Sequence, residues 1–328
     1  MQLKSNNTRN IRWGIIGLGK IANKFAADLA TLENAELFAV ASRSKQNADN
    51  FVTKYNATKA YNSYLDLAKD TQVDAIYIAT PHSFHKEHAI LCLQNKKAVL
   101  CEKPFAMNLQ EVTEMITVAK ENNVLLMEAL WTYFLPHFQY VVNIVKSEKF
   151  GKLIALEADF GFYNKYNTNS RVFKKEVGGG SLLDIGIYPI FAALATLGKP
   201  DTIDANATFF ENGADSECNI TFTYKNAKAT LKSSLLEQTP THAIFTFENA
   251  NVKMNTRFHE PSTITILKNG KEETIDFKTN TIGYNFEIEH FNSLLRNNKK
   301  ESDFMTFEFS KNLIKTLDSV RDIIGLEY

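Results

Sequence analysis

A lysine directly after an apolar run is the residue of this chain best placed to do chemistry. The run 98–101 predicts a buried parallel strand, and Glu102, Lys103 and Pro104 follow it. Open α/β sheets bind ligands outside the carboxyl ends of their strands. A lysine at that edge can hydrogen-bond a reacting oxygen, and its pKa can be lowered there. Pro104 fixes its own φ and keeps Lys103 out of the helical region, which favours an ordered turn over a solvated surface side chain.

A second pair of chemical residues follows three consecutive glycines at 178–180. Ser181 is expected to cap a helix that runs to about residue 197. Asp184 and Tyr188 are four residues apart in it and so share one face. Their neighbours are apolar, and a carboxylate in such surroundings requires a partner. Spacing alone favours a core tyrosine for Tyr188, and a carboxylate stabilised by the helix dipole for Asp184.

The start of the chain carries a dinucleotide-binding fingerprint of the form G-x-G-x-x-A. It lies between a predicted strand at 11–16 and a predicted helix at 21–32. The first glycine allows a tight turn, the second a close approach to pyrophosphate, and the alanine close packing of helix on sheet. The residues expected to hold the pyrophosphate are Gly17, Gly19, Lys20 and Ile21.

The end of the second predicted strand, 37–41, indicates which nicotinamide cofactor is used. NAD-preferring folds carry an acidic residue there. This chain has Ser42 and Arg43 instead. No carboxylate repels a 2′-phosphate, and the planar guanidinium can pair with one. NADP is therefore the expected cofactor, with NAD as the alternative.

A loop after the buried strand 73–79 adds further candidate contacts at the same sheet edge. His82, His85 and His88 are spaced by three, which raises the question of a metal site. Metal-binding histidines need further ligands on a shared face, and His82 precedes the helix, so no metal is expected. Contacts to the nicotinamide ribose or substrate are expected instead. The cofactor-binding residues assigned here are Thr80, Pro81, His82, His85 and Glu102.

Strand and helix patterns predict an α/β protein of two domains. Strands alternate with helices up to residue 128, which is typical of a parallel, doubly wound sheet. Beyond it, successive alternating runs predict a largely antiparallel sheet, closed by helices at 285–296 and 306–324. We expect an N-terminal Rossmann domain at 1–128 and a C-terminal α/β domain with a largely antiparallel open sheet at 129–328.

Composition narrows the class of protein. The 328 residues have a formal net charge of zero, which gives no reason to expect nucleic acid or a membrane surface as partner. No stretch resembles a membrane span, and residues 1–10 lack a signal-peptide core. Cys92, Cys101 and Cys218 have no metal or redox spacing, which favours free thiols in a reducing cytoplasm.

Three motifs together resemble the glucose–fructose oxidoreductase / inositol dehydrogenase (Gfo/Idh/MocA) family over essentially the full chain. They are the G-x-G-x-x-A fingerprint, Glu102-Lys103-Pro104 and the segment 178–189. Within the family, Met127-Glu128-Ala129-Leu130-Trp131 and D-I-G-x-Y-P most resemble dimeric trans-dihydrodiol dehydrogenases and NADP-dependent D-xylose dehydrogenases. The resemblance implies an NAD(P)-binding first domain, and a second domain for substrate binding and dimerisation.

The resemblance also implies the reaction, a hydride transfer between nicotinamide and a carbinol carbon of a sugar, polyol or diol. Lys103 carries over as the catalytic lysine, with Asp184 and Tyr188 as its partners. Tyr188 is the candidate general base, but Lys103 itself could serve, and a coupled pair cannot be separated from sequence. Relatives often carry arginine where this chain has Tyr133. The residues expected near a small-molecule substrate are Trp131, Tyr133, Phe162 and Arg171.

Two other kinds of function remain open at this point: a non-catalytic NAD(P)-binding sensor, and an NAD-assisted glycosidase on the same fold. A homodimer or larger homo-oligomer is also expected. Apolar alternation at 220–224 and 244–247 lies in strands that the expected helices are too few to cover. An apolar sheet face left open would require a partner.

Overall fold

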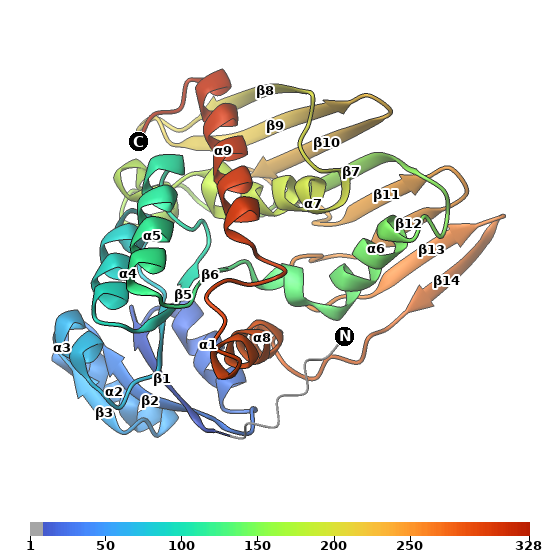
Figure 1. Ribbon diagram of the computed structural model, residues 1–328. Helices are drawn as coiled ribbons and strands as arrows, with labels where there is room; N and C mark the ends of the chain where they lie inside the picture. The colour runs from blue at the N-terminus through green and yellow to red at the C-terminus, as the bar shows by residue number, and fades with distance from the viewer. Residues whose placement is uncertain (1–8) are drawn as a thin grey trace. The chain divides into compact units, whose positions relative to one another are not determined.

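The computed structural model describes residues 9–328, and these divide into two compact units (Figure 1). The first unit comprises the described chain up to Trp131 together with Asn280–Lys311. The second comprises Thr132–Thr279 and Asn312–Tyr328. The division differs from a single boundary at residue 128, because Asn280–Lys311 joins the first unit. The helix in this segment is bonded to the first unit, as described below.

Six parallel strands form the sheet of the first unit, in the order β3-β2-β1-β4-β5-β6 (Figure 1). This confirms the parallel, doubly wound sheet. The order changes direction between β1 and β4, which is where such sheets bind ligands. The elements are β1 (Ile11–Ile16), α1 (Lys20–Leu29), β2 (Ala35–Ala41), α2 (Lys45–Tyr55), β3 (Lys59–Tyr61), α3 (Tyr64–Lys69), β4 (Ala75–Ile78), η1 (His82–Phe84), α4 (His85–Gln94), β5 (Ala98–Glu102), α5 (Leu109–Asn122), β6 (Leu126–Ala129) and α8 (Tyr284–Arg296).

Asp28, near the end of α1, attaches α8 to the first unit. Its carboxylate accepts the backbone N–H groups of Ile282, Gly283, Tyr284 and Asn285, at 3.0, 2.7, 2.7 and 3.3 Å. An α-helix leaves its first N–H groups without partners inside the helix, and an anion is favoured at that end. The N-terminus of α8 is therefore capped by a side chain from a distant part of the chain.

Packing of buried side chains extends this attachment along α8. Trp13 of β1 donates a hydrogen bond from Nε1 to Asn292 Oδ1 at 3.0 Å. At the start of the helix, Tyr284 stacks on Trp131 with ring centroids 4.4 Å apart. Both contacts lie within the first unit, so α8 is an integral part of it.

Eight strands form the sheet of the second unit, in the order β14-β13-β12-β11-β7-β10-β9-β8. Only the pair β7 and β10 is parallel, which confirms a largely antiparallel sheet. The elements are η2 (Trp131–Phe134), which begins at the last residue of the first unit, α6 (Pro136–Lys146), β7 (Leu153–Gly161), η3 (Arg171–Phe173), η4 (Lys175–Val177), η5 (Leu182–Gly186), α7 (Ile187–Leu197), β8 (Thr202–Phe209), β9 (Asp215–Tyr224), β10 (Ala227–Ser234), β11 (Ala243–Phe247), β12 (Asn251–Met254), β13 (Ile264–Lys268), β14 (Lys271–Ile275) and α9 (Phe307–Ile324), whose first turn belongs to the first unit.

Most apolar residues of β9 and β11 lie on the buried face of this sheet, and only Ile244 of β11 lies on the partly exposed face. Ile220, Phe222 and Phe247 are 3, 0 and 3% exposed. Helix α7 packs on β7 and β10, and α6 packs on β12. The expectation of an open apolar face was therefore wrong, because helices within the unit cover the apolar side of the sheet.

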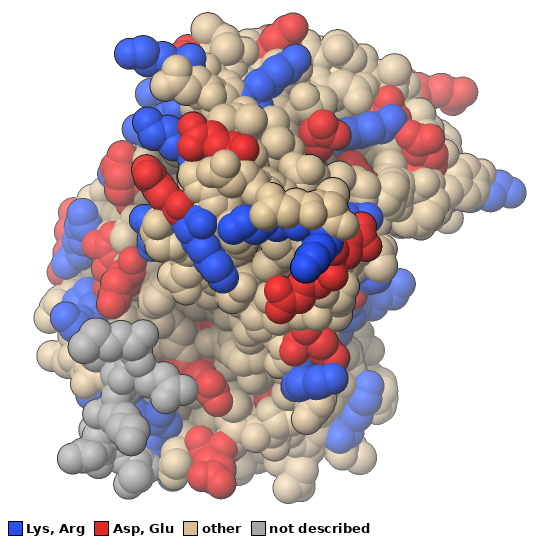
Figure 2. All heavy atoms as spheres, turned by 90° about the vertical axis from the view of Figure 1, so that its right-hand side faces the viewer, with Lys and Arg blue, Asp and Glu red and all other residues tan. Residues whose placement is uncertain are grey.

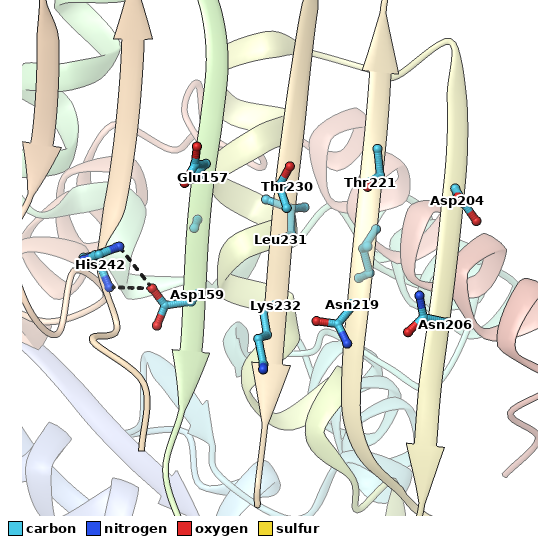
Figure 3. A pocket seen from close by; sticks show the side chains of 12 residues that line it. Glu157, Asp159, Asp204, Asn206, Asn219, Thr221, Thr230, Leu231, Lys232 and His242 are labelled. Atoms are coloured by element: carbon cyan, nitrogen blue, oxygen red, sulfur yellow. Dashed lines mark hydrogen bonds and ion pairs between the residues drawn. The ribbon is translucent and has the colours of Figure 1, made fainter. Parts of the chain in front are cut away.

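The opposite face of the same sheet is polar and contains a hollow of about 270 Å³. Figure 3 shows the side chains that line it, projecting from neighbouring strands, and the interaction of His242 with Asp159. Those labelled are Glu157, Asp159, Asp204, Asn206, Asn219, Thr221, Thr230, Leu231, Lys232 and His242.

One segment is long and apolar enough to cross a membrane, contrary to the expectation from sequence. It is Lys175–Leu197, which contains α7. Of its apolar window, 89% is buried inside the structure. An internal core helix has this combination of composition and burial, since it is apolar all round and packs on a sheet.

Charged side chains of both signs are interspersed on the face shown in Figure 2. Blue lysines and arginines lie beside red aspartates and glutamates, in keeping with the balance of 37 basic and 37 acidic residues. This face therefore carries no extended field of one sign that would steer a polyanion.

Replacing Asp28 should destabilise the protein more than removing an ordinary helix cap. Asp28→Ala leaves four buried or partly buried N–H groups without their acceptor, which we expect to cost about 2–4 kcal/mol. The control is Ser44→Ala at the exposed N-cap of α2, where about 1 kcal/mol is expected. Urea unfolding of both variants measures the difference, and equal losses would contradict the role given to Asp28.

Candidate active site

Two buried carboxyl groups hold the turn that carries Lys103. Glu102 Oε2 accepts the Lys103 N–H at 3.2 Å, and Glu102 Oε1 accepts the Tyr77 hydroxyl. Glu128, on the neighbouring strand β6, accepts the Phe105 N–H through Oε1 at 3.1 Å. Burial, followed by the charge of Glu102, raises the pKa of Tyr77 well above its ordinary value. Glu102, assigned to the cofactor from sequence, thus fixes the backbone on which Lys103 is mounted.

The histidines after β4 connect their loop to this turn. The His85 ring spans two carbonyl oxygens, with Nδ1 2.9 Å from Pro104 O and Nε2 2.8 Å from Thr80 O. His88 Nδ1 lies 3.0 Å from Thr80 Oγ1, and burial lowers the pKa of His88. His82 begins η1 and is 5% exposed, directly after Pro81. Within residues 9–328, no three His, Cys, Asp or Glu side chains are grouped to hold a metal ion.

The glycine fingerprint has the geometry that a diphosphate requires. Gly17 has a φ of 88°, and a Cβ there would come within 2.8 Å of the backbone after β4. At Gly19, an added Cβ would meet nothing within 4 Å, so the backbone is open to a ligand. Lys20 and Ile21 begin α1, whose N-terminus has no side-chain cap and no acidic residue in its first turn. An anionic group fits this helix end, where N–H groups and the helix dipole attract it.

The end of β2 presents a cation and no carboxylate. Arg43 is exposed and close enough to Tyr64 to affect its pKa, which burial raises and that guanidinium lowers less strongly. Ser42 Oγ accepts the Ser44 N–H at 3.2 Å, and Ser44 in turn caps α2. The segment is therefore ordered by its own hydrogen bonds, and the Arg43 side chain is exposed at its surface.

Asp215 anchors the helix that carries the second pair of candidate residues. Its Oδ2 accepts the Ser181 hydroxyl at 2.7 Å and the Leu182 N–H at 2.6 Å. Burial raises the pKa of Asp215 to about 6. Gly180 has a φ of 135°, and a Cβ there would collide with the Asp215 carboxylate. Ser181 does not cap the helix as expected, because its hydroxyl donates to Asp215 instead.

Asp184 lies in a π-helical turn, η5, and Tyr188 follows in the first turn of α7. Short π-helical turns are frequent at functional sites. Asp184 is 8% exposed and accepts a hydrogen bond from Arg171 Nη2 at 2.8 Å. Arg171, assigned to the substrate from sequence, therefore neutralises the carboxylate within the second unit.

Two aromatic side chains that sequence analysis did not select surround Tyr188. Phe160 and His259 have ring centroids 5.6 and 5.1 Å from that of Tyr188, and they stack on each other at 4.1 Å. His259 Nε2 lies 3.7 Å from Glu260 Oε1. No local pattern marks His259, since it lies in an irregular segment between two short strands.

The aromatic residues assigned to the substrate are largely packed inside their units. Trp131 is 3% exposed against Tyr284 in the first unit. Tyr133 is 9% exposed, lies edge-on to Phe191 at 5.3 Å, and has its pKa raised by burial. Phe162 is half-buried, and its N–H donates to a backbone carbonyl of β10. Lys103 belongs to the first unit, whereas Asp184, Tyr188 and Arg171 belong to the second.

Comparison with known proteins identifies the family. Residues 11–130 match the profile of an oxidoreductase family with an NAD-binding Rossmann fold, and residues 138–253 match the GFO/IDH/MocA C-terminal domain. The trans-1,2-dihydrobenzene-1,2-diol dehydrogenase of Xenopus tropicalis is 33% identical over 97% of this chain and 99% of its own. The chain belongs to the Gfo/Idh/MocA oxidoreductase family. The resemblance seen in the sequence is confirmed, and the protein is an NAD(P)-dependent oxidoreductase.

Further members and solved structures extend the comparison. The NADP(+)-dependent scyllo-inositol 2-dehydrogenase of Bacillus subtilis is 34% identical over 97% of this chain and 98% of its own. A 3-ketoreductase from Actinomadura kijaniata, solved with NADP and TDP-benzene, has a TM-score of 0.87 at 24% identity, covering 96% of this chain and 98% of that one. An aldose-aldose oxidoreductase from Caulobacter crescentus has a TM-score of 0.89 at 18% identity, covering 97% and 98%. At these identities, both structures establish the shared fold.

Proposed function

We propose that this Gfo/Idh/MocA enzyme uses NADP to transfer a hydride between nicotinamide and a carbinol carbon of a cyclic diol, polyol or sugar. The observation that carries the proposal is Lys103 on a turn whose backbone is held by buried side chains, together with Asp184 and Tyr188. The relatives at 33 and 34% identity are named for a dihydrobenzenediol and an inositol. Both compounds carry adjacent hydroxyl groups on a six-membered carbon ring.

The chemistry divides between the cofactor and the side chains. Bound NADP supplies the hydride acceptor. Oxidation of a carbinol also requires its hydroxyl proton to leave, and Tyr188 is the proposed base, with its phenolate favoured by the Lys103 ammonium. Lys103 would also polarise the oxygen, and Asp184 would orient that ammonium. Arg171 pairs with Asp184 Oδ1, which keeps this carboxyl group in its charged form.

A panel of cyclic diols, inositols and aldoses tests the proposed function. Each compound is assayed with NADP and NAD by nicotinamide absorbance. Turnover of at least one diol or polyol with a net change in absorbance is expected. Nucleotide that stays bound without net reduction would point to a different use of the fold.

Arg43→Ala should weaken binding of NADP selectively. The guanidinium lies directly after β2, near Tyr64, and is exposed, so it is accessible for a charge-assisted contact with a 2′-phosphate. Losing that contact should cost roughly 1.5–3 kcal/mol, about one to two decades in Kd. The matched control is Lys45→Ala, which removes a neighbouring cation that pairs with Asp49. Equal wild-type affinity for NAD and NADP, or equal losses for both, would refute the assignment.

Lys103→Met and Tyr188→Phe should each remove most of the catalysed rate. Acid–base catalysis contributes typically about 10²–10⁴-fold. If both groups act on one proton, the double variant should lose little more than either single variant. The control is Tyr224→Phe, which removes another tyrosine hydroxyl of the second unit, one that donates to Gly198 O. Measured kcat/KM values distinguish a catalytic Tyr188 from one that only packs in the core. A fully active Tyr188→Phe would leave Lys103 as the sole acid–base.

We also propose that two copies of the chain associate through the polar face of the eight-stranded sheet. What supports this is a broad sheet face with a hollow and side chains of both signs, such as Asp159, Asp204 and Lys232. A two-fold interface places the same surface on both partners, so charges of opposite sign on one face can pair with their copies.

Light scattering tests this assembly. The wild type should have a mass of twice 37.1 kDa at micromolar concentration. Thr221→Arg places a long cation beside the hollow and should return the mass to that of one chain. A wild-type mass of one chain would rule out the dimer, and a dimeric Thr221→Arg would rule out this face.

We further propose a cytoplasmic location, supported by the state of the cysteines. Cys92, Cys101 and Cys218 are free and buried. Burial raises the pKa of Cys92 and of Cys218 to about 12, so these thiols resist conversion to the reactive thiolate. A chain with three unpaired buried thiols suits a reducing compartment.

A further inference from the structure

Glu128 is a buried acid directly beside the turn that carries Lys103. It is 2% exposed and lies on β6, where the register places it opposite Cys101 of β5. Its Oε1 accepts the Phe105 N–H at 3.1 Å, and Ser310 in the first turn of α9 lies near enough to the carboxyl to lower its pKa. Among the described residues, Oε2 has no hydrogen-bond partner. Half of the carboxylate is therefore unsolvated, which opposes its ionisation.

The two charged groups near Glu128 have opposite effects on its ionisation. Glu102, on the adjacent strand, disfavours a second negative charge, whereas the Lys103 ammonium favours one. Burial is the largest influence and raises the pKa of Glu128 to about 7, while Ser310 and the Phe105 N–H act in the opposite direction. The carboxyl is thus poised to change charge near neutral pH, beside a lysine.

A third buried acid increases the crowding of negative charge behind the same turn. Glu287 of α8 is 0% exposed, and neither of its oxygens has a hydrogen-bond partner among the described residues. Burial, then Glu102 and Asp28, raise its pKa well above the ordinary value. Glu102 thus opposes the ionisation of both Glu128 and Glu287, so the charge of these buried acids depends on pH.

We propose that Glu128 is a positioning residue for Lys103, which holds the lysine's turn through the Phe105 N–H and sets, by its own charge, how readily the ammonium gives up a proton. The ionised carboxylate is the stronger acceptor for the N–H and also stabilises the nearby ammonium. The neutral acid does both less well. Since this matters only if Lys103 takes part in the reaction, the inference rests on the proposed function.

Glu128→Gln separates charge from shape, because the amide keeps an acceptor oxygen for Phe105 and cannot titrate. The wild-type profile of kcat/KM against pH should contain a limb near pH 7 that Glu128→Gln lacks. Without the anion, the limb assigned to Lys103 and Tyr188 should also move to lower pH, by an amount on the order of one unit. The KM for NADP should change less than kcat.

Two further variants test the hydrogen bond to Phe105 and the titration of Glu128 separately. Glu128→Asp retains an acid but withdraws it from the Phe105 N–H, so kcat should fall while a titrating limb remains. Ser310→Ala removes a hydroxyl that favours the charged carboxylate, so the limb near pH 7 should move to higher pH. Ser310 lies outside the turn, and this small substitution tests the titration even if the Glu128 variants fold poorly.

Glu287→Gln is the matched control, because it neutralises an equally buried acid that has no bond to the turn. It should leave the limb near pH 7 in place. A merely structural Glu128 would change thermal stability and leave the pH profile of Glu128→Gln superimposable on that of the wild type, which would overturn the inference. Loss of the limb in Glu287→Gln but not in Glu128→Gln would overturn it as well.

Stability and infrared measurements distinguish failure of this inference from failure of the proposed function. Because its folded pKa is raised from 4.5 to about 7, Glu128 contributes stability that is fully present below about pH 4.5 and is lost as pH rises through 7. Glu128→Gln should therefore unfold at higher temperature than the wild type above pH 7. An infrared titration needs no substrate: a carboxylic-acid signal with a midpoint near pH 7 should be present in the wild type and in Glu287→Gln, and absent in Glu128→Gln. Absence of that titration in an active wild-type enzyme would refute the role of Glu128 alone.

Discussion

A buried carboxylate that accepts backbone N–H groups is the interaction on which both units depend. Asp28 holds the start of α8, Glu128 holds the turn after Lys103, and Asp215 holds the start of the segment that carries Asp184 and Tyr188. Each carboxylate loses hydration on burial, and the N–H groups compensate for part of that loss. In return, a side chain fixed in a sheet or helix determines where an irregular segment begins. The candidate catalytic residues lie in a turn and at a helix start, and hydrogen bonds to side chains of neighbouring strands hold these segments in place.

Local sequence was sufficient for the parts of the structure that depend on local chemistry. The apolar runs predicted the parallel strands, and the fingerprint predicted the tight turn at Gly17 and the buried Ala22, because period and turn geometry involve neighbouring residues. The partners of Asp28 lie 254–257 residues away, and no spacing rule connects them. His259 was missed for the same reason. The apolar alternation around Ile220 was read correctly as a sheet face, but its cover by helices is a property of tertiary packing.

The segment that carries Asp184 and Tyr188 is well ordered, although it lies beside buried carboxyl groups. Asp184 is paired with Arg171, and Asp215 behind the same helix is raised to a pKa of about 6. The π-helical turn η5, which contains Asp184, changes the spacing of side chains relative to a regular helix. Gly180 and Asp215 fix the position of this turn. Such a turn is less favourable than regular helix. Its presence here is consistent with selection for the placement of side chains over the stability of the helix.

The return of Asn280–Lys311 to the first unit also governs how the chain can fold during synthesis. Domains generally form as units when they emerge from the ribosome, beginning with the N-terminal one. Here the N-terminal sheet could assemble early, yet the Asp28 carboxylate would lack its backbone N–H partners until α8 had been made. For most of translation, the nascent first unit would thus expose a charged carboxylate and the apolar surface that later receives α8. Apolar surface exposed in this way is prone to aggregate, so the first unit is protected only once the late segment has been made.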